Sequence, residues 1–220
     1  RERNDGILIA GADAWTRDLA QEFKKLDLPV LLVDTNYNKV AKAKIAGLNA
    51  ICANILNEHV REDLELNGIG KLMALTQNDE VNSLAVRECQ TLFGSANLYQ
   101  LTFRKQNQHS QRGLTRNLMG RELFDSELTY SKMEDIHAVG ATFKTTTLSE
   151  NYTYRDFIEH YQNGAKLLCV FDEFKKLSIN TVEHQLQPIE GQTIIALVSS
   201  TVIPDSHEAK KPESAPLGET

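Results

Sequence analysis

The chain has 220 residues, a formal net charge of −6 and a hydrophobic fraction of 41%, which is enough for a globular core. The acidic balance and the absence of a Lys/Arg cluster argue against a nucleic-acid partner, because phosphate binding needs clustered cations. No apolar run reaches the roughly 18 residues of a membrane-spanning helix, and no signal peptide is visible. Because the chain starts at Arg1 rather than Met, we expect a processed chain or a fragment of a longer protein.

The first hundred residues alternate short apolar runs with longer amphipathic ones. The runs are too short for buried helices and predict strands, at 6–10, 30–33, 50–53, 71–76 and 97–102. The segments between them have helical spacing and predict helices, at 14–25, 38–46, 58–66 and 79–93. This order predicts a Rossmann-like, doubly wound parallel sheet with helices on both faces.

A different pattern follows residue 103. Residues 104–112 are polar and predict a loop, and 114–128 have weak helical spacing with one short strand near 123–124. Strands are then predicted at 143–147, 166–171, 176–179 and 191–198, with a helix at 154–161. We therefore expect a Rossmann-like domain over 1–137, a small strand-rich α+β domain over 138–203, and a disordered tail over 204–220.

The sequence offers no recognisable catalytic set. The six histidines have no metal-ligand spacing, and there is no G-x-S-x-G or Walker motif. The three cysteines, Cys52, Cys89 and Cys169, fit no metal or redox motif and are interpreted as reduced core residues. We therefore expect a protein that is not an enzyme and holds no metal.

The turn after the first strand bears on nucleotide binding. A dinucleotide-binding turn has the pattern G-x-G-x-x-G, whereas residues 11–16 read GADAWT. Gly11 is present, but Asp13 and Thr16 replace the second and third glycines. Two interpretations stay open: a nucleotide still binds at this turn, or Asp13 caps the helix over 14–25 and fills the position of a phosphate, which its charge would repel.

Three further residues follow predicted strands, where ligands bind in such sheets. Asp34 ends the second strand and is placed to accept hydrogen bonds from ribose hydroxyls. Thr76 ends the fourth strand, and Asp79 behind it is interpreted as the N-cap of the next helix. Arg104, past the fifth strand, can pair with a phosphate or a carboxylate.

This order of features resembles the regulator-of-K⁺-conductance domain, also called the KTN or Trk-type NAD-binding domain, over residues 5–125. The resemblance rests on Gly11 and Asp34 at two strand ends and on five segments: AKIAGLNA at 43–50, LELNGIG at 64–70, MALT at 73–76, NDEVN at 78–82 and LTFR at 101–104. Residues 142–199 resemble the smaller strand-rich lobe that follows this domain in some cation/proton antiporters.

The resemblance implies nucleotide contacts at six positions: Gly11, Ala12, Asp13, Asp34, Thr76 and Arg104. It implies AMP, ATP or NAD as the ligand. The alternative of no ligand stays open, because the family has glycine where Asp13 and Thr16 stand and Gly-Asp where residues 53–54 read Ala-Asn.

The resemblance also implies a regulatory module on the cytoplasmic side of a bacterial membrane, attached to the transmembrane part of a Na⁺/H⁺ or K⁺/H⁺ antiporter. Such a module forms a homodimer, here through helices near the sheet edge and residues 114–128. Two alternatives are a ligand-free dimerisation domain with a degenerate nucleotide site and a stand-alone NAD(P)-dependent oxidoreductase. The missing glycines and catalytic set argue against the latter.

Overall fold

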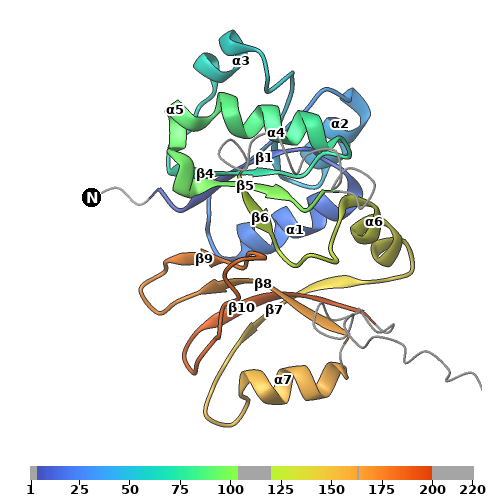
Figure 1. Cartoon of the computed structure of the whole chain (residues 1–220), viewed down its shortest axis with the longest axis vertical. Coiled ribbons are helices and arrows are strands. Elements are labelled where there is room, and N and C mark those ends of the chain that lie inside the picture. The colour runs from blue at the N-terminus through green and yellow to red at the C-terminus, as the bar shows by residue number, and fades with distance from the viewer. Residues whose placement is uncertain (1–3, 104–119, 163, 200–220) are drawn as a thin grey trace, which may run out of the picture.

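A computed structural model describes residues 4–103, 120–162 and 164–199. Its first sheet has six parallel strands in the order β3-β2-β1-β4-β5-β6 (Figure 1). The strands are β1 (Gly6–Ala10), β2 (Val30–Asp34), β3 (Asn49–Cys52), β4 (Ile69–Ala74), β5 (Leu98–Leu101) and β6 (Arg121–Leu123). The order reverses between β1 and β4, as in doubly wound sheets, and confirms the expected Rossmann-like class.

Helices cover both faces of this sheet. They are α1 (Ala14–Lys25), α2 (Tyr37–Ile45), α3 (Glu58–Asp63), α4 (Asp79–Glu88), α5 (Gln90–Phe93) and α6 (Tyr130–Ala138). Strand side chains alternate between faces, so Ile7 and Ile9 of β1 join the core that contains α1, whereas Leu8 and Ala10 join the core that contains α4. Every residue of β1 is buried, which is why its sequence is continuously apolar.

The second sheet is antiparallel, with the order β7-β10-β8-β9. Its strands are β7 (Thr142–Thr147), β8 (Ala165–Phe171), β9 (Leu177–Ile179) and β10 (Thr193–Val198). Helix α7 (Tyr154–Tyr161) packs on the face turned away from the first sheet (Figure 1). A capping box between Thr153 and Asp156 starts this helix, and buried Phe157 anchors it.

Helix α1 lies between the two sheets, which share one hydrophobic core (Figure 1). Its inner side chains Trp15, Leu19 and Phe23 are buried among residues of both sheets. Cys169 and Ile195 represent the antiparallel sheet in that cluster. The apolar face of α1 therefore stabilises both sheets together.

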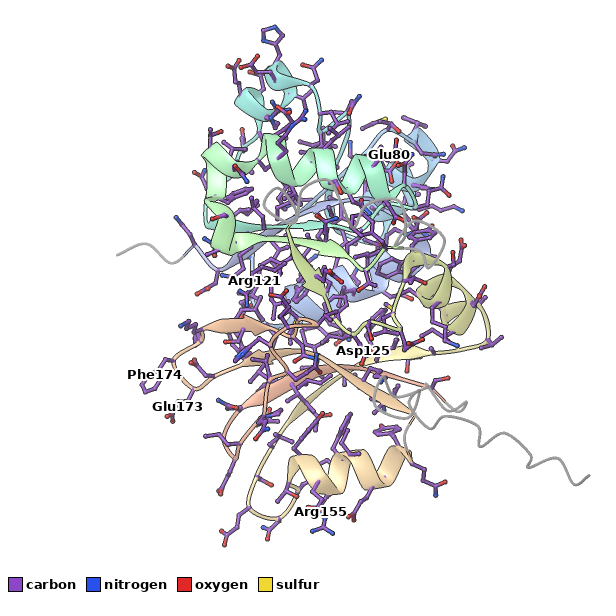
Figure 2. All side chains as sticks on the ribbon, in the orientation of Figure 1. Glu80, Arg121, Asp125, Arg155, Glu173 and Phe174 are labelled. Atoms are coloured by element: carbon purple, nitrogen blue, oxygen red, sulfur yellow. The ribbon has the colours of Figure 1, made fainter. Side chains whose placement is uncertain are left out.

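Polar contacts reinforce this junction. Asp125, which lies between the two sheets (Figure 2), accepts a hydrogen bond from the Lys166 ammonium of β8 at 3.1 Å, and both side chains are almost wholly buried. On α1, Glu22 accepts a hydrogen bond from the hydroxyl of Thr145 on β7 at 2.6 Å. Because Asp125 and Lys166 are paired, neither is left with the desolvation penalty of an isolated buried ion.

Several expected elements differ in the structure. The helix expected over 79–93 is divided at Cys89, whose backbone leaves the helical region (φ −92°, ψ 3°). Cys89 and Phe93 both pack against the same face of the sheet as α4. The helix expected over 58–66 ends at Asp63. Helix α6 was not expected, although Thr129 caps it and Tyr130, Met133 and Ile136 are buried at three-residue spacing.

Other expectations fall on residues that the structure does not describe: Arg104, the loop at 104–112, residues 114–119 and the tail after 203. The short strand expected near 123–124 is β6. The proposed division at 137/138 stays a proposal.

The interpretation of all three cysteines as core residues is wrong for Cys52. Cys52 ends β3, the outermost strand of the sheet, and is exposed, whereas Cys89 and Cys169 are buried. Burial raises the pKa of Cys89 to about 11 and raises the pKa of Cys169 as well. The thiolate is the reactive form of cysteine. Both buried thiols are therefore protected in two ways, by their inaccessibility and by their raised pKa.

Iodoacetamide at pH 7.5 is expected to alkylate Cys52 in the native protein and to reach Cys89 and Cys169 only after denaturation. Peptide mass spectrometry at increasing times distinguishes the three sites. Alkylation of Cys89 in the native protein at a rate similar to that of Cys52 would contradict the buried placement of α4.

The shared core predicts a large effect of truncating its central side chain. Phe23→Ala should lower the free energy of unfolding by about 3–5 kcal/mol, since Phe23 is completely buried. Phe174→Ala is the matched control, because Phe174 points into solvent from the β8–β9 turn (Figure 2) and is 69% exposed; its effect should stay within about 0.5 kcal/mol. Urea denaturation followed by circular dichroism measures both. Equal effects would contradict the placement of α1.

Candidate functional site

A cavity of about 340 Å³ opens at the carboxyl ends of β1 to β4. This is the edge of a doubly wound sheet at which ligands bind, next to the reversal of strand order. Four segments contribute the lining: Ala10, Gly11 and Asp13 at the end of β1, residues 33–36 and Lys39 from β2 onward, residues 53–56 after β3, and residues 76–78 and Val81 after β4. Gly11, Asp13, Asp34 and Thr76 all line it, so the structure brings these sequence-predicted residues together.

Gly11 forms the tight turn from β1 towards α1. Its φ of +117° lies in the region that favours glycine, and a Cβ atom would stand 3.2 Å from the Leu75 carbonyl oxygen. Its amide donates to the Val33 carbonyl at 2.9 Å, which ties the turn to β2. Thr16, at the third glycine position, is fully buried in the helix.

Asp34 organises the backbone around the cavity. One carboxylate oxygen accepts the Ala12 amide at 2.9 Å, and the other accepts the Asn36 amide at 2.8 Å. Ala12 thus supports the turn without lining the cavity itself. A carboxylate offers about four lone-pair positions, so Asp34 retains acceptor capacity for a ligand's hydroxyl groups.

Asp13 occupies the N-cap position of α1, but its side chain makes no capping hydrogen bond. The expected cap by the Asp13 side chain is therefore wrong. One carboxylate oxygen pairs with the Lys39 ammonium of α2 at 2.5 Å, and the other accepts a hydrogen bond from the Tyr130 hydroxyl of α6 at 2.7 Å. Two partners that are distant in sequence hold the carboxylate away from the helix amides.

The charge of Lys39 is held by its acidic neighbours. Burial lowers its pKa, but the hydrogen bond and charge of Asp13, together with Asp34 and Glu134, outweigh this effect and leave the pKa above the usual lysine value. Because the pKa of Lys39 is raised in the folded state, its charge contributes stability that is fully present below the unfolded pKa and is lost as pH rises through the folded pKa.

Thr76 is hydrogen-bonded to the buried side chain of Asn82. Its amide and hydroxyl both donate to the Asn82 side-chain oxygen, at 3.0 and 2.7 Å, and the Asn82 amide donates back to the Thr76 carbonyl. The N-cap of α4 is Asn78, whose oxygen accepts two helix amides, so the expected cap by Asp79 is wrong. Asp79 is instead a buried residue of the first helical turn.

Sequence reasoning missed Lys39, Tyr130 and Asn82. Lys39 and Asn82 lie within helices and Tyr130 starts one. Asn82 ends the NDEVN segment at 78–82, but that segment assigned it no role, and only packing brings the three side chains to the strand ends. Arg104, the sixth candidate, lies outside the described residues. In the described part of the chain, no group of three or more His, Cys, Asp or Glu side chains is placed to hold a metal ion.

The TrkA-N domain family model matches residues 7–118, just over half of the 220 residues. The chain belongs to the TrkA-N domain family. Together with the parallel sheet, this confirms the resemblance to RCK-type domains, which are typically non-catalytic regulatory modules of potassium channels and transporters.

No protein of curated function matches this TrkA-N chain in sequence. Among solved structures, the TrkA-N domain of inner membrane protein ybaL from Escherichia coli is 13% identical, with a TM-score of 0.46, 63% of this chain covered and 97% of that one. The NAD(P)-binding domain of an exopolyphosphatase-related protein from Archaeoglobus fulgidus is 17% identical, with a TM-score of 0.45 and coverages of 62% and 98%.

The GsuK RCK domain is 13% identical, with a TM-score of 0.46, and the match covers 90% of this chain and 45% of that one. The TrkA-N chain thus spans less than half of that protein. Within residues 4–103, 120–162 and 164–199, none of the helices has the length and apolar character that a bilayer crossing requires.

The hydrogen bonds of Asp34 predict a structural role. Asp34→Ala removes the acceptor of two backbone amides and should lower the free energy of unfolding by roughly 1–3 kcal/mol. Asp63→Ala, at an exposed position that ends α3, is the control with the same change of charge and should have almost no effect. Chemical denaturation measures both; an equal loss in the two variants would contradict the role of Asp34.

Proposed function

We propose that this TrkA-N chain is the ligand-sensing, dimerising regulatory module of a bacterial Na⁺/H⁺ or K⁺/H⁺ antiporter, on the cytoplasmic side of the membrane. The observation that carries the proposal is the cavity at the strand ends, lined by Gly11, Asp13, Asp34 and Thr76, in a chain of this family. The attachment to a transmembrane antiporter rests on the resemblance of residues 142–199 to the lobe of such proteins.

The size of the cavity favours a small ligand. Its volume of about 340 Å³ lies at the lower end of the range of about 300–1,000 Å³ for small-molecule sites. This favours a compound no larger than a mononucleotide, such as AMP, or the adenosine part of ATP, over a complete dinucleotide such as NAD. Asp34 would accept hydrogen bonds from the ribose hydroxyls, as expected from its place at the end of β2.

Regulation would follow from the geometry of a dimer. A ligand that binds one dimer geometry more tightly shifts the population towards it by the ratio of its two affinities, and equal affinities shift nothing. Sedimentation of the isolated chain tests this step, and a monomer at high concentration would contradict it.

A second candidate is ligand-free dimerisation. The observation that favours it is the pairing of Asp13 with Lys39 and Tyr130, since the charged groups at the turn already have partners within the chain. The two candidates differ in whether any ligand stabilises the protein.

Thermal unfolding with adenosine, AMP, ADP, ATP, NAD and NADH, each at about 1 mM, distinguishes the candidates. A ligand at about 100 times its Kd stabilises the native state by about 2.7 kcal/mol, which raises Tm by several degrees in a domain of this size. Sodium pyrophosphate at the same concentration is the control for ionic effects. A rise with at least one compound supports the sensing module, and no rise with any of them supports the ligand-free alternative.

A further inference from the structure

We propose that the cavity selects a nucleoside, with ribose hydroxyls and a base but no phosphate, and that Asp13 is the residue that excludes the phosphate. This inference rests on the proposed function, because it specifies the ligand of the same site. It follows from three observations: the partners of the Ala12 amide, Lys39 and Arg17 near the turn, the charges of the cavity, and the anchoring of Asp13.

Three donors near the turn already have partners within the chain. A phosphate at the end of β1 needs amide or cationic donors, but the Ala12 amide donates to Asp34 at 2.9 Å. The Lys39 ammonium is paired with Asp13. The Arg17 guanidinium donates to the Ala12 carbonyl at 2.6 Å, and Arg17 does not line the cavity.

The charges of the cavity are also unfavourable to an anion. Among the described residues that line it, the charged ones are Asp13, Asp34 and Lys39, so two carboxylates face one ammonium. A phosphate at the turn would lie beside the Asp13 carboxylate. Like charges within a few ångströms repel strongly in a partly buried site.

Asp13 is held where it would meet the phosphate. Only 14% of its side chain is exposed, and each carboxylate oxygen has its own partner, Lys39 on α2 and Tyr130 on α6. The Tyr130 ring packs edge-on against Trp15 in the shared core, with ring centroids 6.0 Å apart. To turn away, Asp13 would have to lose both partners.

The rest of the cavity suits an uncharged nucleoside. Ile55, Leu56 and Val81 provide apolar surface for a base. Asp13 and Asp34 are the only acids among the described residues that line the cavity. The spare acceptor positions of Asp34 suit hydroxyl groups.

Isothermal titration calorimetry of the whole chain tests the inference. The ligands are the four ribonucleosides, the 5′-monophosphate of each, and NAD. The wild-type protein should bind one nucleoside at least about tenfold more tightly than its monophosphate, as expected for a close like-charge contact. Asp13→Asn keeps the size of the side chain but removes the charge, and should reduce this preference about tenfold. Lys39→Met leaves Asp13 without its counter-charge and should increase the preference.

Asp18→Asn is the matched control. It makes the same change of charge on the same helix, but Asp18 pairs with His137 and does not line the cavity, so the preference should stay at its wild-type value. Circular dichroism and thermal unfolding establish that each variant is folded.

The outcomes separate this inference from the proposed function. A monophosphate or NAD that binds the wild-type chain as tightly as its nucleoside, or an unchanged preference in folded Asp13→Asn, would overturn phosphate exclusion and leave ligand sensing intact. No binding of any compound to either the wild type or Asp13→Asn would overturn ligand sensing and, with it, this inference.

Discussion

The burial of α1 between two sheets is the interaction on which the rest of the structure depends. The buried face of α1, formed by Trp15, Leu19 and Phe23, packs in the core of the parallel sheet and contacts the antiparallel sheet at the same time. The helix is thereby fixed along its whole length, and its first turn stands at the strand ends where the cavity opens. Contacts from Glu22 to Thr145 and from Asp18 to His137 add polar links to the later part of the chain. The same helix therefore contacts the cavity at its first turn and the second sheet along its buried face.

Asp13 belongs both to the packing of the helices and to the lining of the cavity. In the glycine-rich turn of a dinucleotide-binding protein, the absence of side chains lets a pyrophosphate reach the backbone. Here a carboxylate stands at that position, and Lys39 and Tyr130 compensate its charge and hydrogen-bonding capacity. The helix N-terminus, which favours a negative charge, already has one from the chain itself. The same side chain links α1, α2 and α6, so the composition of the turn and the packing of three helices are coupled.

Much of the fold could be predicted because each strand and helix carries a local signal. The apolar runs at 6–10 and 30–33 and the amphipathic segment at 14–25 became β1, β2 and α1 at nearly the same residues. The division at Cys89 and the exposure of Cys52 could not be predicted, since both depend on how a helix or an edge strand is packed rather than on its own residues. Helix α6 did carry a signal, in Thr129 and the spacing of its buried residues, but the signal is short.

Periodicity and chain order were enough to predict the doubly wound sheet and to place Gly11, Asp34 and Thr76 at strand ends, because the carboxyl ends of parallel strands lie along one edge. The family was recognised from the resemblance of short sequence segments, and the family model matches residues 7–118. The contacts that those residues make depend on the tertiary structure. Asp13 became an ion-pair partner rather than a helix cap because Lys39 and Tyr130, 26 and 117 positions away, were brought to it by packing. Hydrogen bonds and ion pairs depend on distances of about 3 Å, and no local pattern specifies such distances between remote segments.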